Sequence, residues 1–496
     1  MPLELSRRAA LTSALAGAAA VGVGAARGSD AATAALPRTT DPALHAARRL
    51  TYGATQDVVD RIRTLGLAGW VDEQLKDTPD LHGELAALGS STLPLPSKVL
   101  ATARPEAVTD LQAATFARAA WGDRQLFELL VETFSNHLSI SVVDDAVGVL
   151  KVADDRDVVR KHVLGTFSDM LVASMQSPAM LTYLTNIYSH TPSPNENYAR
   201  ELLELHTVGA RAGYTQRDVR AASFVLTGLT VDVTGAFAYR PSWHDTRSVR
   251  VLGWHSANSD PAGGVAVATS LARYLAAHPS TAHRIAEKLV RRFVSDTPPP
   301  SLVASAAKVY RASGTAIVPT VRHILLSHEF AHSADHKVQR PLEWAAMAVR
   351  TLRLQQAPTD HTSGAALVGM LEVLGQTPFG WVQPDGYPDV AEAWATTASM
   401  LTRWSTAQAL VGGWNPAFEK LDVTALVGTP APTTVGGLVD RLARRILLRS
   451  PRRALRAALV RSTGKPASAR VDSTAITALT PTLAALLLSS PEGQVR

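Results

Sequence analysis

Residues 193–228 constrain the fold more than any other stretch, because the signals that start and stop a helix are all present there. Ser193 and Glu196 have the S-x-x-E spacing of a capping box, which satisfies free N–H groups at the start of a helix. Pro194 suits the first helical position, where its missing N–H costs no hydrogen bond. Gly209 suits the C-terminal cap, since glycine readily adopts the left-handed backbone found there. The sequence therefore predicts a helix between Ser193 and Gly209.

A second helix is predicted immediately after a short loop. Thr215 and Asp218 repeat the capping pattern in a looser form, and Gly228 closes this helix as Gly209 closes the first. The loop at residues 209–214 has no carboxylate, so the pair of helices is not a calcium-binding EF-hand. The second helix carries small and apolar side chains where a DNA-reading helix needs polar ones. The pair therefore indicates a helical scaffold rather than a calcium site or a DNA-binding motif.

The first of these helices carries its polar residues on one side. At about 100° per residue, the arc opposite the leucines holds Asn197, Arg200, Glu201 and Glu204. Glu201 and Glu204 are one turn apart, so they could ligate a cation or raise each other's pKa toward acid–base chemistry. Alternatively, Arg200 pairs with Glu204 and the stripe is a solvated ion-pair network. The sequence leaves both interpretations open.

His206 completes an E-x-x-E-x-H pattern that has the appearance of a metal-ligand set. In a straight helix, however, His206 lies roughly 200° around the axis from Glu204, within the apolar arc. A metal ion bound by Glu201, Glu204 and His206 within one straight helix is therefore not expected.

Both predicted helices resemble the signature of a known family. NENYARELLELHTVG at residues 195–209 is similar to its N-E-N-[FY]-A-R-E-L-x-E-L segment. YTQRDVRAASFVLTG at residues 214–228 is similar to its Y-[TS]-x-x-D-V-x-x-x-A-x-x-L-T-G segment. The family is a bacterial one, known as domain of unknown function 1800. Ser223 is the one departure in these segments, a small residue where the family has alanine.

Other parts of the chain resemble further motifs of this family. They are HAARRLTYGAT (residues 45–55), FSNHLSI (134–140), the His244–Asp245 pair, HPSTAHRIAEKLVRRFV (278–294), KVQRPLE (337–343) and LGQTPFGWVQPDGYPDVAEAW (374–394). The resemblance covers roughly residues 41–410. It implies a fold and an exported context, but no reaction, because the family has no established activity. It also implies a partner, since the family is frequently paired with a secreted phosphatase-like family.

Residues 1–34 are predicted to be an export signal rather than part of the fold. Arg7 and Arg8 precede an apolar run at residues 9–26, and small residues suitable for cleavage follow. The arginine pair resembles a twin-arginine signal, with Ala10 where that signal usually has phenylalanine. Because the run is rich in glycine and alanine, we expect cleavage rather than a lasting membrane anchor. The predicted location is the cell envelope or the extracellular medium.

The composition excludes several kinds of site. The chain has no cysteine, which rules out disulfides, cysteine-ligated iron–sulfur clusters and thioether-bound haem. A hydrophobic core must therefore hold the 496 residues together, and a chain of this length can bury one. Loss of residues 1–34 leaves a net charge of about +5 with neutral histidines, which does not indicate nucleic-acid binding.

The chain after the signal is predicted to be mainly α, a large multi-helix globular bundle. Helical periodicity runs through most of the sequence, whereas residues 229–255 alternate in the manner of strands around Gly235. There we expect one small β-hairpin excursion, with His244 and Asp245 at its tip. Residues 35–496 form either one helical domain or two packed lobes divided near residues 229–265.

The densest basic run lies near the C-terminus. Its arginines are Arg441, Arg444, Arg445, Arg449, Arg452, Arg453 and Arg456. Outside the cell these side chains could contact an anionic envelope polymer, or they could cover solvated helix faces.

A functional site, if the chain has one, is predicted where the carboxylate stripe meets other family-matching residues. The candidate catalytic residues are Glu201, Glu204, His137, His244 and Asp245; the candidate metal ligands are Glu201, Glu204 and His137; the candidate substrate-binding residues are Asn197 and Arg200. One helix face alone supplies too few groups for a metal ion or a positioned base. The hypothesis is that these residues converge to within roughly 8 to 10 Å around a concave pocket.

Two classes of function fit these observations. In the first, the chain is an exported binding or accessory protein that works with a secreted phosphatase-like protein or an envelope polymer. In the second, it is an exported hydrolase with a carboxylate/histidine site, with or without a divalent metal ion. The sequence contains no phosphate-binding glycine loop, G-x-S-x-G or H-E-x-x-H motif that would decide whether it is an enzyme. We expect no nucleic-acid partner, and no stable membrane span after cleavage of the signal.

Overall fold

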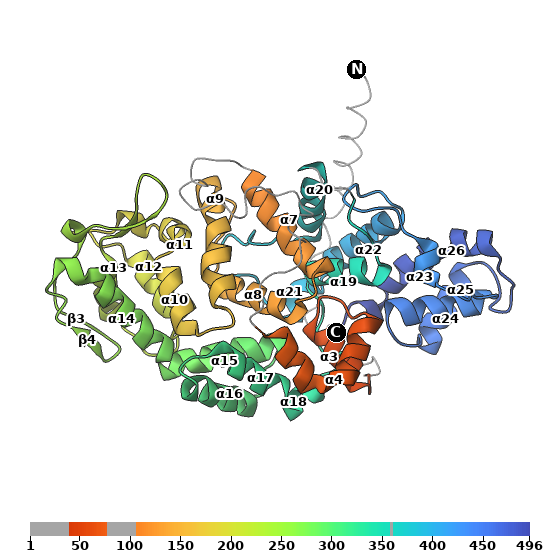
Figure 1. The fold of residues 1–496 in the computed structure, drawn as a ribbon, viewed down its shortest axis with the longest axis horizontal. Coiled ribbons are helices and arrows are strands. Elements are labelled where there is room, and N and C mark those ends of the chain that lie inside the picture. The colour runs from red at the N-terminus through yellow and green to blue at the C-terminus, as the bar shows by residue number, and fades with distance from the viewer. Residues whose placement is uncertain (1–38, 77–105, 358–360) are drawn as a thin grey trace, which may run out of the picture. The chain divides into compact units, whose positions relative to one another are not determined.

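Helices predicted from caps and periodicity make up most of the molecule. The computed structural model describes residues 39–76, 106–357 and 361–496. In these ranges the chain is mainly α with two small two-stranded antiparallel sheets, which confirms the predicted fold class (Figure 1). Residues Arg38–Arg496 form one compact unit. The predicted export signal at residues 1–34 lies outside the described ranges.

The first helices begin at side chains that cap them. The carboxylate of Asp41 accepts hydrogen bonds from the N–H groups of Ala43 and Leu44, and the Thr55 hydroxyl accepts one from Val58. The elements up to residue 188 are α3 (Pro42–Leu50), α4 (Gln56–Gln74), α7 (Glu106–Trp121), α8 (Gln125–His137), α9 (Asp145–Asp154), the π-helix η1 (Asp155–Arg160), α10 (Phe167–Met175), α11 (Pro178–Tyr183) and the 3₁₀-helix η2 (Asn186–Tyr188).

The helix predicted between Ser193 and Gly209 starts later than expected. It begins as α12 (Glu196–Glu201), and the N-cap is Asn195, whose side chain accepts from the N–H of Asn197. The predicted capping role of Ser193 is wrong, because its backbone closes a tight turn with His190 and Asn195 is an equally good cap. The predicted left-handed glycine at the other end is confirmed, with φ of 86° at Gly209.

The second half of this helix is not a straight α-helix. Residues 202–206 form the π-helix η3 (Leu202–His206), in which each turn holds one more residue than in an α-helix. The Thr207 hydroxyl donates to the carbonyl oxygen of Leu202, five residues earlier. The spacing of 100° per residue therefore does not apply beyond Glu201. His206 is nevertheless fully buried, as its apolar arc predicts.

The second predicted helix, α13 (Gln216–Leu226), has the expected ends. Thr215 and Asp218 form the complete capping box, and Gly228 has φ of 82°. Where one hairpin was expected, the chain forms two, because Gly253 allows a second tight reversal with φ of 92°. The strands are β1 (Leu229–Val231) paired with β2 (Phe237–Tyr239), and β3 (Val249–Val251) paired with β4 (Trp254–Ser256).

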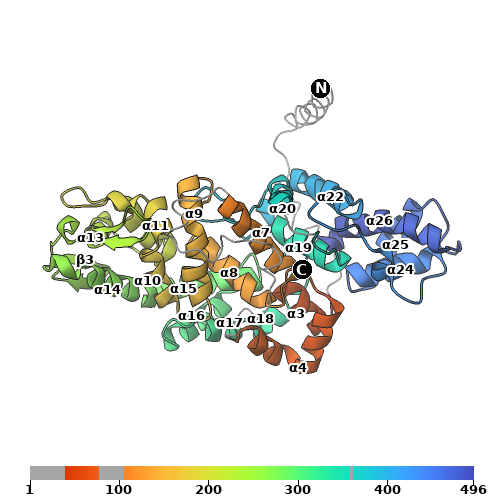
Figure 2. The same ribbon diagram turned by 45° about the horizontal axis from the view of Figure 1, so that its top comes forward.

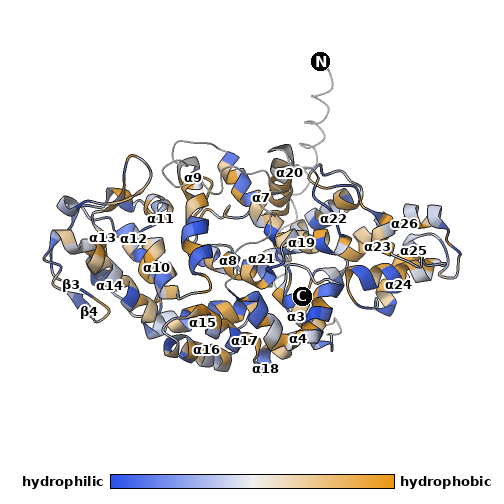
Figure 3. Ribbon diagram, in the orientation of Figure 1, coloured by the Kyte–Doolittle hydropathy of each residue, from blue (hydrophilic) through white to orange (hydrophobic). Residues whose placement is uncertain are grey.

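The remaining elements are helical, and Figure 3 shows hydrophilic and hydrophobic residues together on most of these helices, as amphipathic packing requires. They are η4 (Pro241–Trp243), η5 (Pro261–Gly263), α14 (Gly264–Ala277), α15 (Pro279–Phe293), α16 (Pro300–Ala312), α17 (Ile317–Leu325), α18 (His328–Ala331), α19 (Pro341–Leu352), α20 (His361–Leu374), α21 (Ala391–Trp394), α22 (Thr397–Val411), α23 (Val423–Val427), α24 (Val435–Ile446), α25 (Arg453–Ser462), α26 (Ser473–Ser489) and η6 (Pro491–Gly493). Within the described ranges no helix is both long and apolar enough to cross a bilayer.

Helix α19 is the most deeply buried long helix. It contacts α7, α20, α22 and α24, and it lies among them in Figures 1 and 2. Trp344 is fully buried, and its indole N–H donates to the carbonyl oxygen of Leu488 at 3.3 Å. Packing around α19 therefore joins segments from both halves of the sequence.

A buried ion-pair network crosses the molecule at the start of α19. Arg292, Arg340 and Arg496 all pair with the carboxylate of Glu343, at 2.9 Å for Arg340 and 3.0 Å for Arg496. Glu132 on α8 accepts from Arg340 at 2.5 Å and from Arg292 at 3.2 Å. Burial alone would raise the pKa of Glu343, but the three guanidinium groups hold it well below its usual value. The network ties α8, α15 and α19 to the end of the chain.

Candidate functional site

The predicted carboxylate stripe lies on α12 and η3, but its arginine faces a different partner from the one expected. Arg200 pairs with Glu196 at 3.6 Å and donates to the side-chain oxygen of Gln216 at 2.8 Å. The Arg200–Glu204 pairing considered from the sequence is absent. Asn197 is exposed, and its side-chain amide donates to the carbonyl oxygen of Leu184. Neither Asn197 nor Arg200 is therefore free of structural contacts.

Glu201 and Glu204 are half-buried on this stripe. The hydroxyl of Tyr214 donates to Glu204 at 2.7 Å. Burial raises the pKa of Glu201, and the negative charges of Glu204 and Asp385 raise it further. Glu201 thus holds a proton more readily than an ordinary surface carboxyl group.

A lysine that the sequence analysis did not single out lies in the same neighbourhood. Lys288 on α15 is half-buried, and it has no hydrogen bond or ion pair to any other residue in the described ranges. Burial lowers the pKa of Lys288 to about 7, and the nearby Arg284 and Arg291 contribute in the same direction. Glu287 on the same helix pairs with Arg291 at 2.7 Å rather than with Lys288.

The loop at residues 381–388 supplies the remaining groups. Asp385 acts on the pKa of both Glu201 and Lys288, so it lies near each of them. It accepts a hydrogen bond from the Trp381 indole at 2.8 Å. Tyr183 donates to the carbonyl oxygen of Val382 at 2.7 Å, and burial raises its pKa to about 12, helped by Asp385 and Glu201. An acid and an amine with opposite pKa shifts therefore share one neighbourhood, an arrangement typical of acid–base sites.

His137 lies behind the same helical segment. Its Nε2 is 2.9 Å from the carbonyl oxygen of His206, and burial, together with Lys288 and Arg284, lowers the pKa of His137 well below its usual value. Burial likewise lowers the pKa of His206 to about 3. Both rings are therefore neutral at physiological pH. His137 Nδ1 and both ring nitrogens of His206 lack a hydrogen-bond partner among the residues that the structure describes.

His244 and Asp245 make their contacts elsewhere, beside the two hairpins. His244 Nδ1 is 3.0 Å from the carbonyl oxygen of Thr227, and its Nε2 is 2.8 Å from the side-chain oxygen of Asn258. Asp245 pairs with Arg247, and its N–H donates to the Thr227 hydroxyl at 2.8 Å. These bonds fasten the chain after β2 to the end of α13. The structure thus places Glu201, Glu204 and His137 around one segment, with His244 and Asp245 bonded to another.

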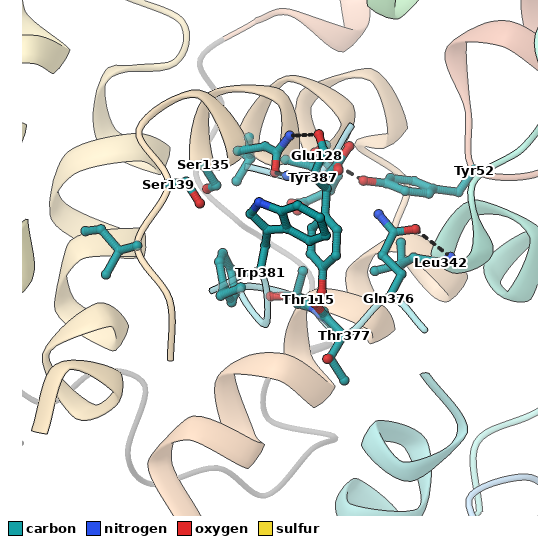
Figure 4. Close-up of a pocket in the computed structure, with 16 residues that line it drawn as sticks. Tyr52, Thr115, Glu128, Ser135, Ser139, Leu342, Gln376, Thr377, Trp381 and Tyr387 are labelled. Carbon is teal, nitrogen blue, oxygen red and sulfur yellow. Dashed lines mark hydrogen bonds between the residues drawn. The ribbon is translucent and has the colours of Figure 1, made fainter. Parts of the chain in front are cut away.

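The 376–388 loop also lines a small cavity (Figure 4). It encloses about 40 Å³ between α8 and this loop. Trp381 and Tyr387 occupy the centre of Figure 4, with ring centroids 5.1 Å apart, and Ser135 and Ser139 lie beside them. The Ser135 hydroxyl is buried and has no hydrogen-bond partner in the described part of the chain. We refer to this space as the α8 cavity.

Hydrogen bonds from Asn136 and Gln376 hold the wall of the α8 cavity in place. The side-chain amide of Asn136 donates to the carbonyl oxygen of Tyr387 at 2.7 Å and accepts from the N–H of Tyr387 at 2.7 Å. Gln376 accepts from the N–H of Leu342 at 3.1 Å. Gly386 fits beneath this wall because any Cβ there would meet the carbonyl oxygen of Asn136 at 2.2 Å, and its φ is 77°. The resembling motifs around residues 136, 376 and 386 therefore describe parts of one wall.

The comparison with known families agrees with these motifs. Residues 45–495 match the profile of a family described as Protein of unknown function (DUF1800). The chain belongs to the DUF1800 family. No curated protein and no solved structure gives a significant match.

For this DUF1800 chain, the metal ligands considered from the sequence do not form a complete set. Among the residues that the structure describes, no group of three or more histidine, aspartate or glutamate side chains is placed to hold a metal ion. Nε2 of His137 is already within hydrogen-bond distance of the carbonyl oxygen of His206. A metal ion bound by Glu201 and Glu204 would need further ligands from outside the predicted set of Glu201, Glu204 and His137.

Sequence reasoning missed the lysine and the loop aspartate of this DUF1800 chain. Lys288 lies in the HPSTAHRIAEKL segment, in which Glu287 pairs with Arg291 rather than with Lys288. Asp385 directly precedes the G-Y-P motif. Position within a resembling motif was the available signal for both, but nothing local indicated that Lys288 lacks a counter-ion.

Proposed function

We propose that this DUF1800 chain is an exported cell-envelope or extracellular protein that acts by binding, as an accessory protein to a secreted protein partner. The α8 cavity is the proposed point of contact. The observation that carries the proposal is that Tyr52, Asn136 and the 376–387 loop, from three separate family-like motifs, line this one rigid cavity. A wall fixed before binding reduces the entropy lost when a partner binds.

The size of the α8 cavity favours a single side group over a whole small molecule. Pockets that enclose small molecules usually measure roughly 300 to 1,000 Å³, whereas this one encloses about 40 Å³. A side chain that projects from a larger partner fits such a space. Recognition by one inserted group also suits a protein–protein contact, where a few anchors provide most of the binding energy.

The lining indicates which side group it receives. The carboxylates of Glu128 and Glu132 are already paired with arginines, Glu128 with Arg160 at 2.8 Å. The buried Ser135 hydroxyl, which has no hydrogen-bond partner in the described ranges, can donate or accept and lines the cavity together with Trp381. A protonated amino group on the partner would donate to the Ser135 hydroxyl and contact the indole, because aromatic faces attract cations.

This proposal is tested by filling the cavity or opening its wall. Immobilised mature protein is exposed to the secreted fraction of the producing bacterium, and the retained partner is quantified by mass spectrometry. Ser135→Leu and Trp381→Ala should each reduce retention at least about tenfold, the loss expected of an anchor worth 1.4 kcal/mol or more. Ser259→Leu and Trp414→Ala, at exposed positions, are the matched controls. Equal retention by all four folded variants would contradict the proposal.

Export is tested separately from binding. Arg7→Lys with Arg8→Lys should leave the precursor inside the cell, since the twin-arginine route requires the arginine pair. Fractionation and immunoblotting measure this. Secretion at the normal level would rule out that route.

A second candidate function is hydrolysis at the Glu201 neighbourhood, and the opposite pKa shifts of Glu201 and Lys288 favour it. A base or acid works best when its pKa is near the working pH, and the pKa of Lys288 is about 7. Lys288 would exchange a proton with the leaving group or with water, while Glu201 holds or releases a second proton. Asp385 and Tyr183 would position these groups.

The hydrolase candidate is separated from the binder by activity and metal content. Model esters and phosphate esters are assayed with the purified mature protein, and elemental analysis reports bound metal. Glu201→Gln should abolish hydrolysis while barely changing the melting temperature, and Glu419→Gln, at an exposed position, should change neither. A wild-type protein that hydrolyses none of these substrates rejects this candidate and leaves the binding proposal standing.

A further inference from the structure

A second and larger cavity shares no lining residue with the α8 cavity. It encloses about 280 Å³ where the end of α19 meets α24 and the start of α4. Five of its lining residues are arginines: Arg350, Arg353, Arg441, Arg444 and Arg445. No aspartate or glutamate is among the described residues that line it. We call this space the arginine cavity.

Most of these arginines lack an anionic partner. The side chains of Arg353, Arg444 and Arg445 make no hydrogen bond or ion pair with any residue in the described ranges. Arg441 donates to the carbonyl oxygens of Val427 at 3.0 Å and Pro430 at 3.1 Å, which positions the guanidinium without neutralising it. The cavity therefore concentrates positive charge from Arg353, Arg441, Arg444 and Arg445 that no aspartate or glutamate in the described part of its lining balances.

Other arginines of the same C-terminal run are balanced, so the imbalance is local. Arg449 pairs with Asp335 at 3.1 Å and Arg452 with Glu492 at 2.5 Å. Arg456 pairs with Asp440 at 2.8 Å. Arg441, Arg444 and Arg445, none of which pairs with a carboxylate in the described ranges, line the cavity, whereas the exposed Arg453 lies outside it.

The start of α4 adds further donors. Ala54, Thr55 and Gln56 line the arginine cavity, and Thr55 is the N-cap of α4, which runs as a helix from Gln56 to a kink at Gly66. The free N–H groups and the helix dipole give the first turn of a helix a partial positive charge, which attracts anions. Helix and guanidinium groups therefore favour the same kind of ligand.

We propose that the arginine cavity binds the phosphate group of a small soluble phosphorylated molecule. Planar guanidinium groups match the tetrahedral oxygens of phosphate through paired hydrogen bonds, which are among the strongest in proteins. The volume of about 280 Å³ is near the lower end of the usual range for small-molecule pockets, so it accommodates a compact ligand. This binding is independent of the partner proposed for the α8 cavity.

Calorimetric titration of the mature protein tests the proposal. The soluble probes are inorganic pyrophosphate and glucose 6-phosphate, and vesicles containing phosphatidic acid present the same chemistry on a lipid. Both soluble probes should bind, more weakly as salt is added. Arg353→Gln with Arg444→Gln should weaken binding at least about tenfold, since each charge-assisted hydrogen bond contributes that much. Both positions are exposed, so the double variant is expected to fold.

The control removes the same charge from the same region. Arg453→Gln with Arg461→Gln, both exposed on α25 and outside the cavity lining, should bind the probes as the wild type does. The proposal is overturned if neither soluble probe binds, if both double variants lose affinity equally, or if the vesicles bind while the soluble probes do not.

Discussion

His206 illustrates how the surroundings of a side chain determine its protonation state. The ring is fully buried, its nitrogens have no partner among the described residues, and Lys288 and Arg284 lie close enough to oppose its protonation. Burial therefore holds it neutral, with a pKa of about 3. A buried histidine of this kind responds to acid although it is not exposed to solvent.

The expected consequence is a dependence of stability on pH that His206→Phe reduces, since the buried His45 and His137 contribute in the same direction. The folded pKa of about 3 lies below the unfolded value of 6.5, so the stabilisation is complete above pH 6.5. It is lost as pH falls from 6.5 toward 3, at about 1.4 kcal/mol per pH unit for one proton. Urea unfolding of wild type, His206→Phe and the exposed control His283→Phe at several pH values measures it. An unchanged slope in His206→Phe would show that this ring is already protonated in the folded protein.

At the scale of single residues, the sequence predicts the backbone conformation correctly where the type of one residue alone determines it. Glycine at positions 209 and 228 was expected in the left-handed region, and both residues are found there. The two site residues that were missed, Lys288 and Asp385, depend on what neighbouring elements provide. An unpaired lysine has the same local sequence as a paired one.

At the scale of the element, α12 and η3 show which part of a helix its sequence determines. The capping box at Thr215 and Asp218 was predicted because its four residues are consecutive. The π-helix Leu202–His206 was not, because the extra residue per turn reflects packing on α8 and α15 rather than any local signal. Arg284 of α15 donates to the carbonyl oxygen of Leu205 at 3.2 Å, one of the contacts that hold this turn.

The corrected start of α12 can be measured directly. Asn195→Ala should lower the free energy of unfolding by about 1 to 2 kcal/mol, since it removes the cap and two hydrogen bonds to Thr185. Ser193→Ala should change it by less than about 0.5 kcal/mol, as is usual for a surface position. Chemical denaturation compares the two. The reverse order would restore Ser193 as the cap.

At the scale of the whole molecule, the mainly α class was predictable and the contacts that unite it were not. Periodicity and caps are local, so they identified helices. The ion-pair network joins Glu132 to Arg340, 208 residues apart, and Arg292 to Glu132, 160 residues apart. No spacing rule links such residues. The same holds for the α8 cavity and the arginine cavity, whose walls come from distant segments.

This network should be essential for stability. Glu343→Gln should cost about 3 to 5 kcal/mol at neutral pH, because it leaves buried guanidinium groups without their carboxylate. The folded pKa of Glu343 lies well below its usual value of 4.5, so the stabilisation is present above that pH and is lost as pH falls below it. Denaturant unfolding at neutral and acidic pH measures both effects. The exposed Glu419→Gln should be nearly neutral, and an equally small effect at Glu343 would show that the network contributes little.

Site-specific photocrosslinking in cells tests the central claim most directly, namely that the α8 cavity is where a secreted partner binds. A photoreactive amino acid replaces Trp381 beside the cavity or, as the control, the exposed Trp414, in the full-length exported chain. The account predicts a discrete crosslinked protein from position 381, absent from position 414 and lost when Ser135→Leu is added. Discrete crosslinks of equal yield from both positions, or none from position 381, would contradict it.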